Sequence, residues 1–137
     1  MPATHHAIGA FDIKITPLTL ENKSFPETMG RYGLTKEIHG DLEATSIGEM
    51  LTSKTATPGS QAYVAIEYVT GTLNGRKGSF VLQHRGVMAR GNFELLVTVV
   101  PDSGTGELTG LAGTFTINIA DGKHSYDFAY TLADAAK

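Results

Sequence analysis

The sequence predicts an all-β fold, most simply a closed antiparallel barrel of about eight strands. Three observations carry this expectation: apolar and polar residues alternate along several segments, two tight-turn dipeptides join such segments, and glycine recurs 16 times in 137 residues. Alternation with period two is typical of a half-buried strand, and no window repeats apolar residues at the helical period for four turns. A β-sandwich is the alternative arrangement of the same strands.

The composition limits the classes to which this protein can belong. Its length predicts a single domain over residues 1–137, since domains commonly span roughly 100–200 residues. Hydrophobic residues make up 41% of the chain and the net charge is only −3, a composition that can bury a core and does not suit a disordered segment. The absence of cysteine excludes disulfides and thiolate chemistry. The chain also lacks the excess of basic residues that is typical of nucleic-acid-binding proteins, so no nucleic-acid partner is expected.

The first strand is predicted near the N-terminus, where Phe11, Ile13 and Ile15 alternate with polar residues. The histidines at positions 5 and 6 precede it in what we expect to be a loose terminus, and Pro17 ends the strand or places it at an edge. Further strands are predicted over Arg31–Asp41, Leu42–Ser53 and Phe93–Pro101. Connections are predicted over Glu21–Gly30, Thr55–Ser60, Gly86–Asn92 and Asp102–Gly106.

The dipeptide Asn74-Gly75 predicts a two-residue hairpin turn between two apolar runs. Counting back from this turn pairs Glu67 with Leu82 and Ala65 with His84. The face that we expect to point inward then carries Tyr63, Ala65, Glu67, Val69, Phe80, Leu82 and His84. Which of the two faces lines the lumen stays open, because both are rather apolar.

A second hairpin is predicted at Asp121-Gly122, where Phe115 pairs with Phe128. This hairpin has a clean division into an aromatic inner face and a polar outer face. His124, Tyr126 and Tyr130 lie on the aromatic face, where they are candidates to orient a ligand. An aromatic plug that fills the barrel is the plainer interpretation of the same residues.

The first hairpin carries apolar residues on its outer face as well, namely Val64, Ile66, Tyr68 and Val81. A barrel wall with one solvated face should alternate between apolar and polar residues. We therefore expect the outer wall to be covered, most simply by a second copy of the chain, which predicts a homo-oligomer.

Three long stretches carry a family resemblance: GDLEATSIGEML, YVAIEYVTGTLNGRKGSFVLQHRGVM and VPDSGTGELTGLAGTFTINIADGKHSYDFAYTL. They resemble a bacterial family described as domain of unknown function 3224, over about Phe11 to Leu132. The resemblance implies an eight-stranded barrel similar to that of plant allene oxide cyclase. It does not imply that activity, because a fold does not determine a function.

The candidate catalytic residues are Glu67, His84 and Tyr63. The predicted register makes Glu67 and His84 diagonal neighbours on adjacent strands, so their side chains can meet. A carboxylate and an imidazole in an apolar lumen can act as a general acid–base pair, and the Tyr63 hydroxyl can supply a proton. A buried polar pair that merely satisfies itself is the competing interpretation.

Two other patterns carry no predicted chemistry. His39, Asp41 and Glu43 share one face, but this face is expected to be solvated, so no metal site is predicted; a bulge near Gly40 would be needed to turn Glu43 inward. The glycine-rich stretch 104–110 lacks a following helix and a phosphate-binding lysine. We expect a turn that leads into a bent strand there, and no cofactor.

The leading functional hypothesis is a barrel that binds a small apolar molecule in its lumen. The expected ligand-binding residues are Tyr126, Tyr130, His124, Phe80, Leu82 and Phe128. The alternatives are a cofactor-free cyclase or isomerase that uses Glu67 with His84, and a structural module with a solid core. No signal peptide or membrane-spanning stretch is recognised, so a cytoplasmic location without a membrane partner is expected.

Overall fold

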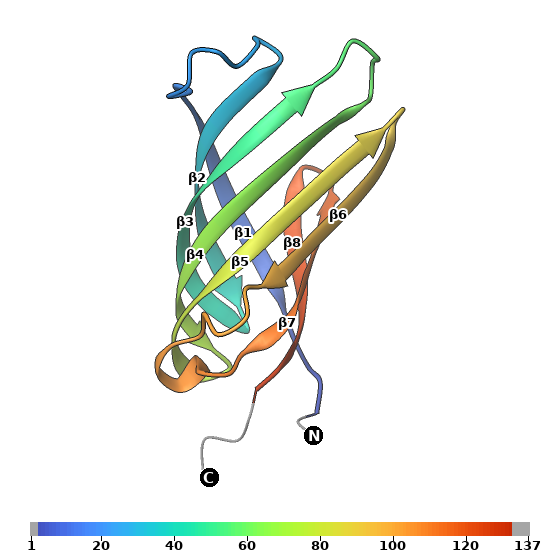
Figure 1. Ribbon diagram of the computed structural model, residues 1–137. Coiled ribbons are helices and arrows are strands. Elements are labelled where there is room, and N and C mark those ends of the chain that lie inside the picture. The colour runs from blue at the N-terminus through green and yellow to red at the C-terminus, as the bar shows by residue number, and fades with distance from the viewer. Residues whose placement is uncertain (1–2, 133–137) are drawn as a thin grey trace.

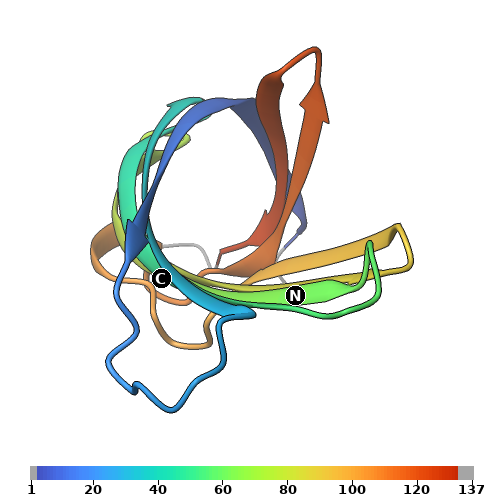
Figure 2. The same cartoon turned by 90° about the horizontal axis from the view of Figure 1, so that it is seen from above.

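The computed structural model describes residues 3–132 and shows eight antiparallel strands joined in chain order into a closed barrel (Figures 1 and 2). The strands are β1 (His5–Leu18), β2 (Met29–Gly40), β3 (Leu42–Lys54), β4 (Gln61–Leu73), β5 (Arg76–Ala89), β6 (Asn92–Val99), β7 (Ala112–Ala120) and β8 (Lys123–Thr131). The predicted barrel is therefore confirmed, and the β-sandwich alternative is wrong because β8 pairs with β1. In the described part of the chain, no helix is long and apolar enough to cross a membrane.

Both predicted hairpin registers are present, because the turns that set them are local. Asn74 and Gly75 both have positive φ angles, of 46° and 86°, as a type I′ turn requires, and Glu67 pairs with Leu82 and Ala65 with His84. In the second hairpin Phe115 pairs with Phe128.

Two sequence predictions about connections and one about the N-terminus need correction. β5 and β6 extend over the segment 86–92, and only Arg90 and Gly91 form the turn, both with positive φ. The stretch 104–110 is not a simple turn; it contains a short 3-10 helix, η1 (Gly106–Leu108), within a longer connection, and β7 follows from Ala112. His5 and His6 are not loose, since both pair with β8.

The lower half of the barrel in Figure 1, where β1 begins and β8 ends, is filled solid. Phe80, Phe115 and Phe128 are almost fully buried, and the rings of Phe80 and Phe128 stack 5.7 Å apart. Leu108 and Leu111 of the connection between β6 and β7 are also buried, so this connection closes the lower end of the barrel. Close packing of this kind leaves no room for a ligand in the lower half.

The seam between β6 and β7 is the weakest part of the barrel wall. These strands share a single register pair, Thr98 with Thr114, whereas β4 and β5 pair along their whole length. Below this pair, the connection after β6 binds the edge of β5 through the hydrogen bond from the Thr105 amide to the Ser79 carbonyl, 2.9 Å long. Above it, β6 and β7 diverge, as Figure 2 shows from above. The wall is therefore continuous in the lower half and interrupted in the upper half.

Candidate functional site

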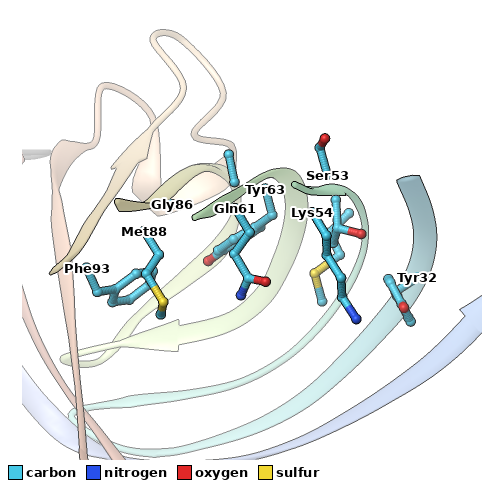
Figure 3. A pocket seen from close by; sticks show the side chains of 11 residues that line it. Tyr32, Ser53, Lys54, Gln61, Tyr63, Gly86, Met88 and Phe93 are labelled. Carbon is cyan, nitrogen blue, oxygen red and sulfur yellow. The ribbon is translucent and has the colours of Figure 1, made fainter. Parts of the chain in front are cut away.

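The upper half of the barrel is hollow. A cavity of about 230 Å³, which we call the inner cavity, is lined mainly by apolar side chains, including Phe11, Ile13, Leu34, Leu95 and Ile117. Its polar lining residues are Lys36, Tyr63, His84 and His124. A vestibule of about 160 Å³ lies beside it toward the loop end of β3, β4 and β5 and has a more polar rim with Lys54 and Gln61 (Figure 3). Tyr63, Met50 and Phe93 line both spaces, so the Tyr63 ring stands where they adjoin.

Glu67 is the centre of a buried polar group that we call the Glu67 cluster: Lys36, Ser46, Glu67, His84 and Tyr63. The carboxylate is fully buried on β4. Its Oε1 atom lies 2.7 Å from His84 Nε2 and 3.1 Å from Lys36 Nζ, and its Oε2 atom accepts a 2.5 Å hydrogen bond from the Ser46 hydroxyl. Donors on β2, β3 and β5 therefore satisfy one carboxylate on β4, as a buried charge requires.

These contacts keep Glu67 ionised. Burial alone would raise the pKa of Glu67, but the hydrogen bond from His84, the charge of Lys36 and the hydrogen bond from Ser46 together lower that pKa to about 2. An ionised carboxylate can only accept hydrogen bonds, so the proton between the two side chains must sit on His84 Nε2. In neutral His84 the Nδ1 atom is then a bare acceptor.

The Tyr63 hydroxyl completes a chain of hydrogen bonds that leads from the carboxylate to the cavity. The hydroxyl lies 3.2 Å from His84 Nδ1, and it donates its proton there when His84 is neutral. Burial, and next the negative charge of Glu67, raise the pKa of Tyr63 to about 12, so the phenol keeps its proton at neutral pH. A hydroxyl, a base and a carboxylate that orients the base are the arrangement used to activate hydroxyl groups in enzymes.

Two glycines make room for the cluster. Gly86 lies directly opposite Tyr63 on β5, and a Cβ atom at position 86 would overlap the Tyr63 ring. Gly48 lies directly opposite Glu67 on β3, and a Cβ atom there would overlap the Ile66 carbonyl and press on Glu67. The missing side chain at position 86 allows the ring of Tyr63 to lie against β5, within reach of His84.

The sequence predicts Tyr63, Glu67 and His84 as candidate site residues, and the structure brings these three together. Lys36 and Ser46 were not predicted. The signal is present, because a solvated face at His39 and Glu43 makes the alternate residues face inward, and steps of two along that inward face reach Lys36 and Ser46. Both side chains are indeed buried.

The other expected ligand-binding residues lie apart from the two cavities, with one exception. His124 lines the inner cavity, beside Phe11 at a ring distance of 5.2 Å. The remainder pack in the lower half of the barrel: Tyr126, Tyr130, Phe80, Leu82 and Phe128. They belong to the core that fills this half: the ring of Phe128 stacks on Phe80 and contacts Tyr130, and the ring of Tyr126 stacks on Phe115.

The hydroxyls of the two tyrosines in the lower half bind the protein itself. The Tyr126 hydroxyl donates to the His39 carbonyl at 2.8 Å and accepts from the Leu42 amide at 3.1 Å, which fastens β8 to the turn between β2 and β3. The Tyr130 hydroxyl accepts from the Asn74 side chain at 2.7 Å. Both hydroxyls thus have internal partners at the closed end of the barrel.

The predicted solvated cluster is exposed, as expected. His39 and Glu43 have side chains that are 56% and 61% exposed, and they contact each other at 3.3 Å on the outer surface. Across residues 3–132, no group of three metal-ligating side chains is arranged to hold a metal ion.

Comparison with known proteins supplies the family. The model of the family described as "Protein of unknown function (DUF3224)" matches residues 7–130. The chain belongs to this family. A crystal structure of a DUF3224 protein of unknown function from Shewanella oneidensis MR-1 is 47% identical, covers 97% of this chain and 100% of its own, and superposes with a TM-score of 0.90. No curated protein matches the chain. The family relationship therefore supports the barrel and names no activity.

Proposed function

We propose that this DUF3224 protein binds a small, largely apolar molecule in the inner cavity. The observation that carries the proposal is the contrast between the two halves of one barrel. The lower half is packed solid, whereas the upper half keeps an apolar cavity of about 230 Å³ with a buried polar cluster at its wall. Binding sites are typically concave and mostly apolar, with a few polar groups that orient the ligand.

The seam between β6 and β7 supplies a route to the cavity. Phe93 on β6 and Ile119 on β7 line the cavity and yet are 54% and 68% exposed, so the apolar lining continues to the surface where the strands diverge. Apolar side chains held at a surface opening are expected where an apolar ligand enters.

The size of the cavity limits the ligand. Sites for drug-sized molecules usually occupy about 300–1,000 Å³, so a cavity of about 230 Å³ suits a molecule of about one ring. Benzene is an appropriate first probe, because dry apolar cavities in proteins bind it.

The test is native mass spectrometry of freshly purified protein, followed by titration with benzene in a protein NMR experiment. We expect a retained small molecule or benzene-induced shifts confined to residues of the inner cavity. The variant Ile117→Trp, which fills the cavity, should weaken benzene binding at least about tenfold, a loss of roughly 1.4 kcal/mol. The matched control Ile47→Trp, on the exposed outer face, should leave binding unchanged. A protein that retains nothing and shows no shifts with millimolar benzene would contradict the proposal.

A second candidate function is a cofactor-free isomerase or cyclase, which the chain Tyr63–His84–Glu67 favours. In such an enzyme a carbon–hydrogen bond next to a ligand carbonyl breaks, and its proton passes to the Tyr63 oxygen while the Tyr63 proton passes to His84 Nδ1. The resulting enolate regains a proton at the same or another carbon as the relay runs backward, so no other reactant is needed.

Exchange of hydrogen for deuterium separates the two candidates. An isomerase should exchange the α-hydrogens of cyclohexanone in deuterium oxide faster than buffer does. The variant Tyr63→Phe should abolish the exchange and still bind the ketone. If the protein binds cyclohexanone without accelerating the exchange, it is a binding protein for this ligand class and the isomerase proposal is wrong for it.

A further inference from the structure

Lys36 is a buried cation at the wall of the inner cavity. It lies on β2 between the inward-facing Leu34 and Ile38, and its side chain is only 2% exposed. Its Nζ atom lies 3.1 Å from Glu67 Oε1 and 4.6 Å from the centre of the Phe11 ring. Among residues 3–132, only Glu67 accepts a hydrogen bond from this ammonium.

The Lys36 ammonium has more N–H donors than the surrounding protein has acceptors. It carries three N–H groups. One N–H group donates to Glu67. The Phe11 ring can engage a second N–H group by a cation–π interaction, which is weaker. The third has no protein acceptor, and leaving a buried donor unpaired is costly. The lining beside it is apolar, with Ile13 and Ile117 among the neighbours, so an acceptor has to come from the cavity itself.

The charge of the cluster indicates which acceptor fits. Glu67 already offsets the charge of Lys36, so a carboxylate ligand would bring a second negative charge into a site of low polarity beside the first. An uncharged oxygen acceptor avoids this cost. The Tyr63 hydroxyl does not compete for the same role when His84 is neutral, because it then donates to His84 Nδ1.

We propose that Lys36 anchors the ligand of the inner cavity by donating a hydrogen bond to an uncharged carbonyl oxygen, so that the ligand class is a small, mainly apolar ketone, aldehyde or ester. This inference rests on the proposed binding function and adds the polar group that the ligand must carry. Lys36 thereby becomes the residue that selects the ligand.

The test compares cyclohexanone with methylenecyclohexane, which has nearly the same shape but carries a CH₂ group in place of the oxygen. Both are titrated into the intact protein and followed by NMR. We expect cyclohexanone to bind at least about tenfold more tightly, since a hydrogen bond to a charged donor commonly contributes that much. The variant Lys36→Met, which keeps the length of the side chain without the ammonium, should bind the two compounds equally.

A measurement on the unmodified protein avoids reliance on a variant that fails to fold. Cyclohexanone labelled with carbon-13 at the carbonyl should show a downfield shift of that carbon on binding, relative to its position in an alkane solvent. The ammonium nitrogen of labelled Lys36 should shift with cyclohexanone and not with methylenecyclohexane.

The outcomes separate this inference from the function on which it rests. If both compounds bind equally tightly to the unmodified protein, or the carbonyl carbon does not shift, the cavity binds apolar molecules and Lys36 does not anchor them. If neither compound binds, the proposed binding function fails as well. If only cyclohexanone is held tightly and Lys36→Met abolishes the preference, the inference stands.

Discussion

The Nε2 atom of His84 lies 2.7 Å from the Oε1 atom of Glu67, across two neighbouring strands and out of contact with solvent. This contact links the carboxylate to the Tyr63 hydroxyl and so to the cavity. An ionised carboxylate inside an apolar barrel is tolerated because His84, Lys36 and Ser46 all donate to it.

The buried carboxylate should make folding depend on acid pH. Because the pKa of Glu67 falls from the ordinary 4.5 to about 2 on folding, its contribution is complete above about pH 5 and is lost as the pH falls toward 2. The shift corresponds to a stabilisation on the order of 3 kcal/mol. Urea unfolding followed between pH 7 and pH 2 should show this loss in the unmodified protein. The variant Glu67→Gln should be less stable at pH 7 and should lack this part of the decline, and an equal decline in both proteins would contradict the assignment.

Gly86 should act as a positioning residue for Tyr63. In Gly86→Ala the new methyl group overlaps the Tyr63 ring, so the ring should move and its hydrogen bond to His84 should break. The nitrogen-15 resonance of His84 Nδ1 should then resemble that in Tyr63→Phe. The control Gly33→Ala, where a Cβ atom meets only ordinary contacts from Leu18, should leave this resonance unchanged. A His84 resonance that is unaltered in Gly86→Ala would contradict the proposed role.

The two halves of the barrel should respond differently to truncation. Phe128→Ala removes a fully buried ring from the solid lower half and should destabilise the protein by about 3–5 kcal/mol. Ile119→Ala, at a side chain that is 68% exposed at the open seam, should change stability by no more than about 0.5 kcal/mol. Thermal or urea unfolding measures both effects. Similar costs at the two positions would indicate that the upper half is packed as tightly as the lower.

The outer face of β3 and β4 should hold a second copy of the chain. Exposed apolar side chains gather on these paired strands: Ile47, Leu51, Val64, Ile66 and Tyr68. Soluble monomers rarely expose contiguous apolar surface of this kind. Size-exclusion chromatography with light scattering should therefore show a mass above 14.6 kDa, and Ile66→Glu should lower it to that of one chain. Asn118→Glu, an exposed position on β7, is the control and should not change the mass. A monomer of the unmodified protein at micromolar concentration would contradict the expectation.

Local sequence determined a large part of the fold and three of the five residues of the Glu67 cluster. Period-two alternation identified strands, and Asn74-Gly75 set the register that places Glu67 beside His84. These features depend on residues near one another in the chain, and turn chemistry reports on them directly. The turn at Arg90-Gly91 was missed because arginine at a positive φ is not a typical hairpin signal.

Closure of the barrel decided the remainder. Lys36 and Ser46 reach Glu67 only because β2, β3 and β4 lie side by side. Alternation along a strand predicts which side chains point inward, but it does not predict which inward side chains of different strands meet. The sequence left the aromatic residues of β8 open between a ligand site and a plug that fills the barrel. Tyr126, Phe128 and Tyr130 fill the lower half, since packing density depends on what all eight strands contribute at one level. The sequence by itself therefore determined the strands, their turns and the Glu67–His84 pair. Only the tertiary structure decided which end is solid, which end is hollow, and that a buried lysine belongs to the wall of the cavity.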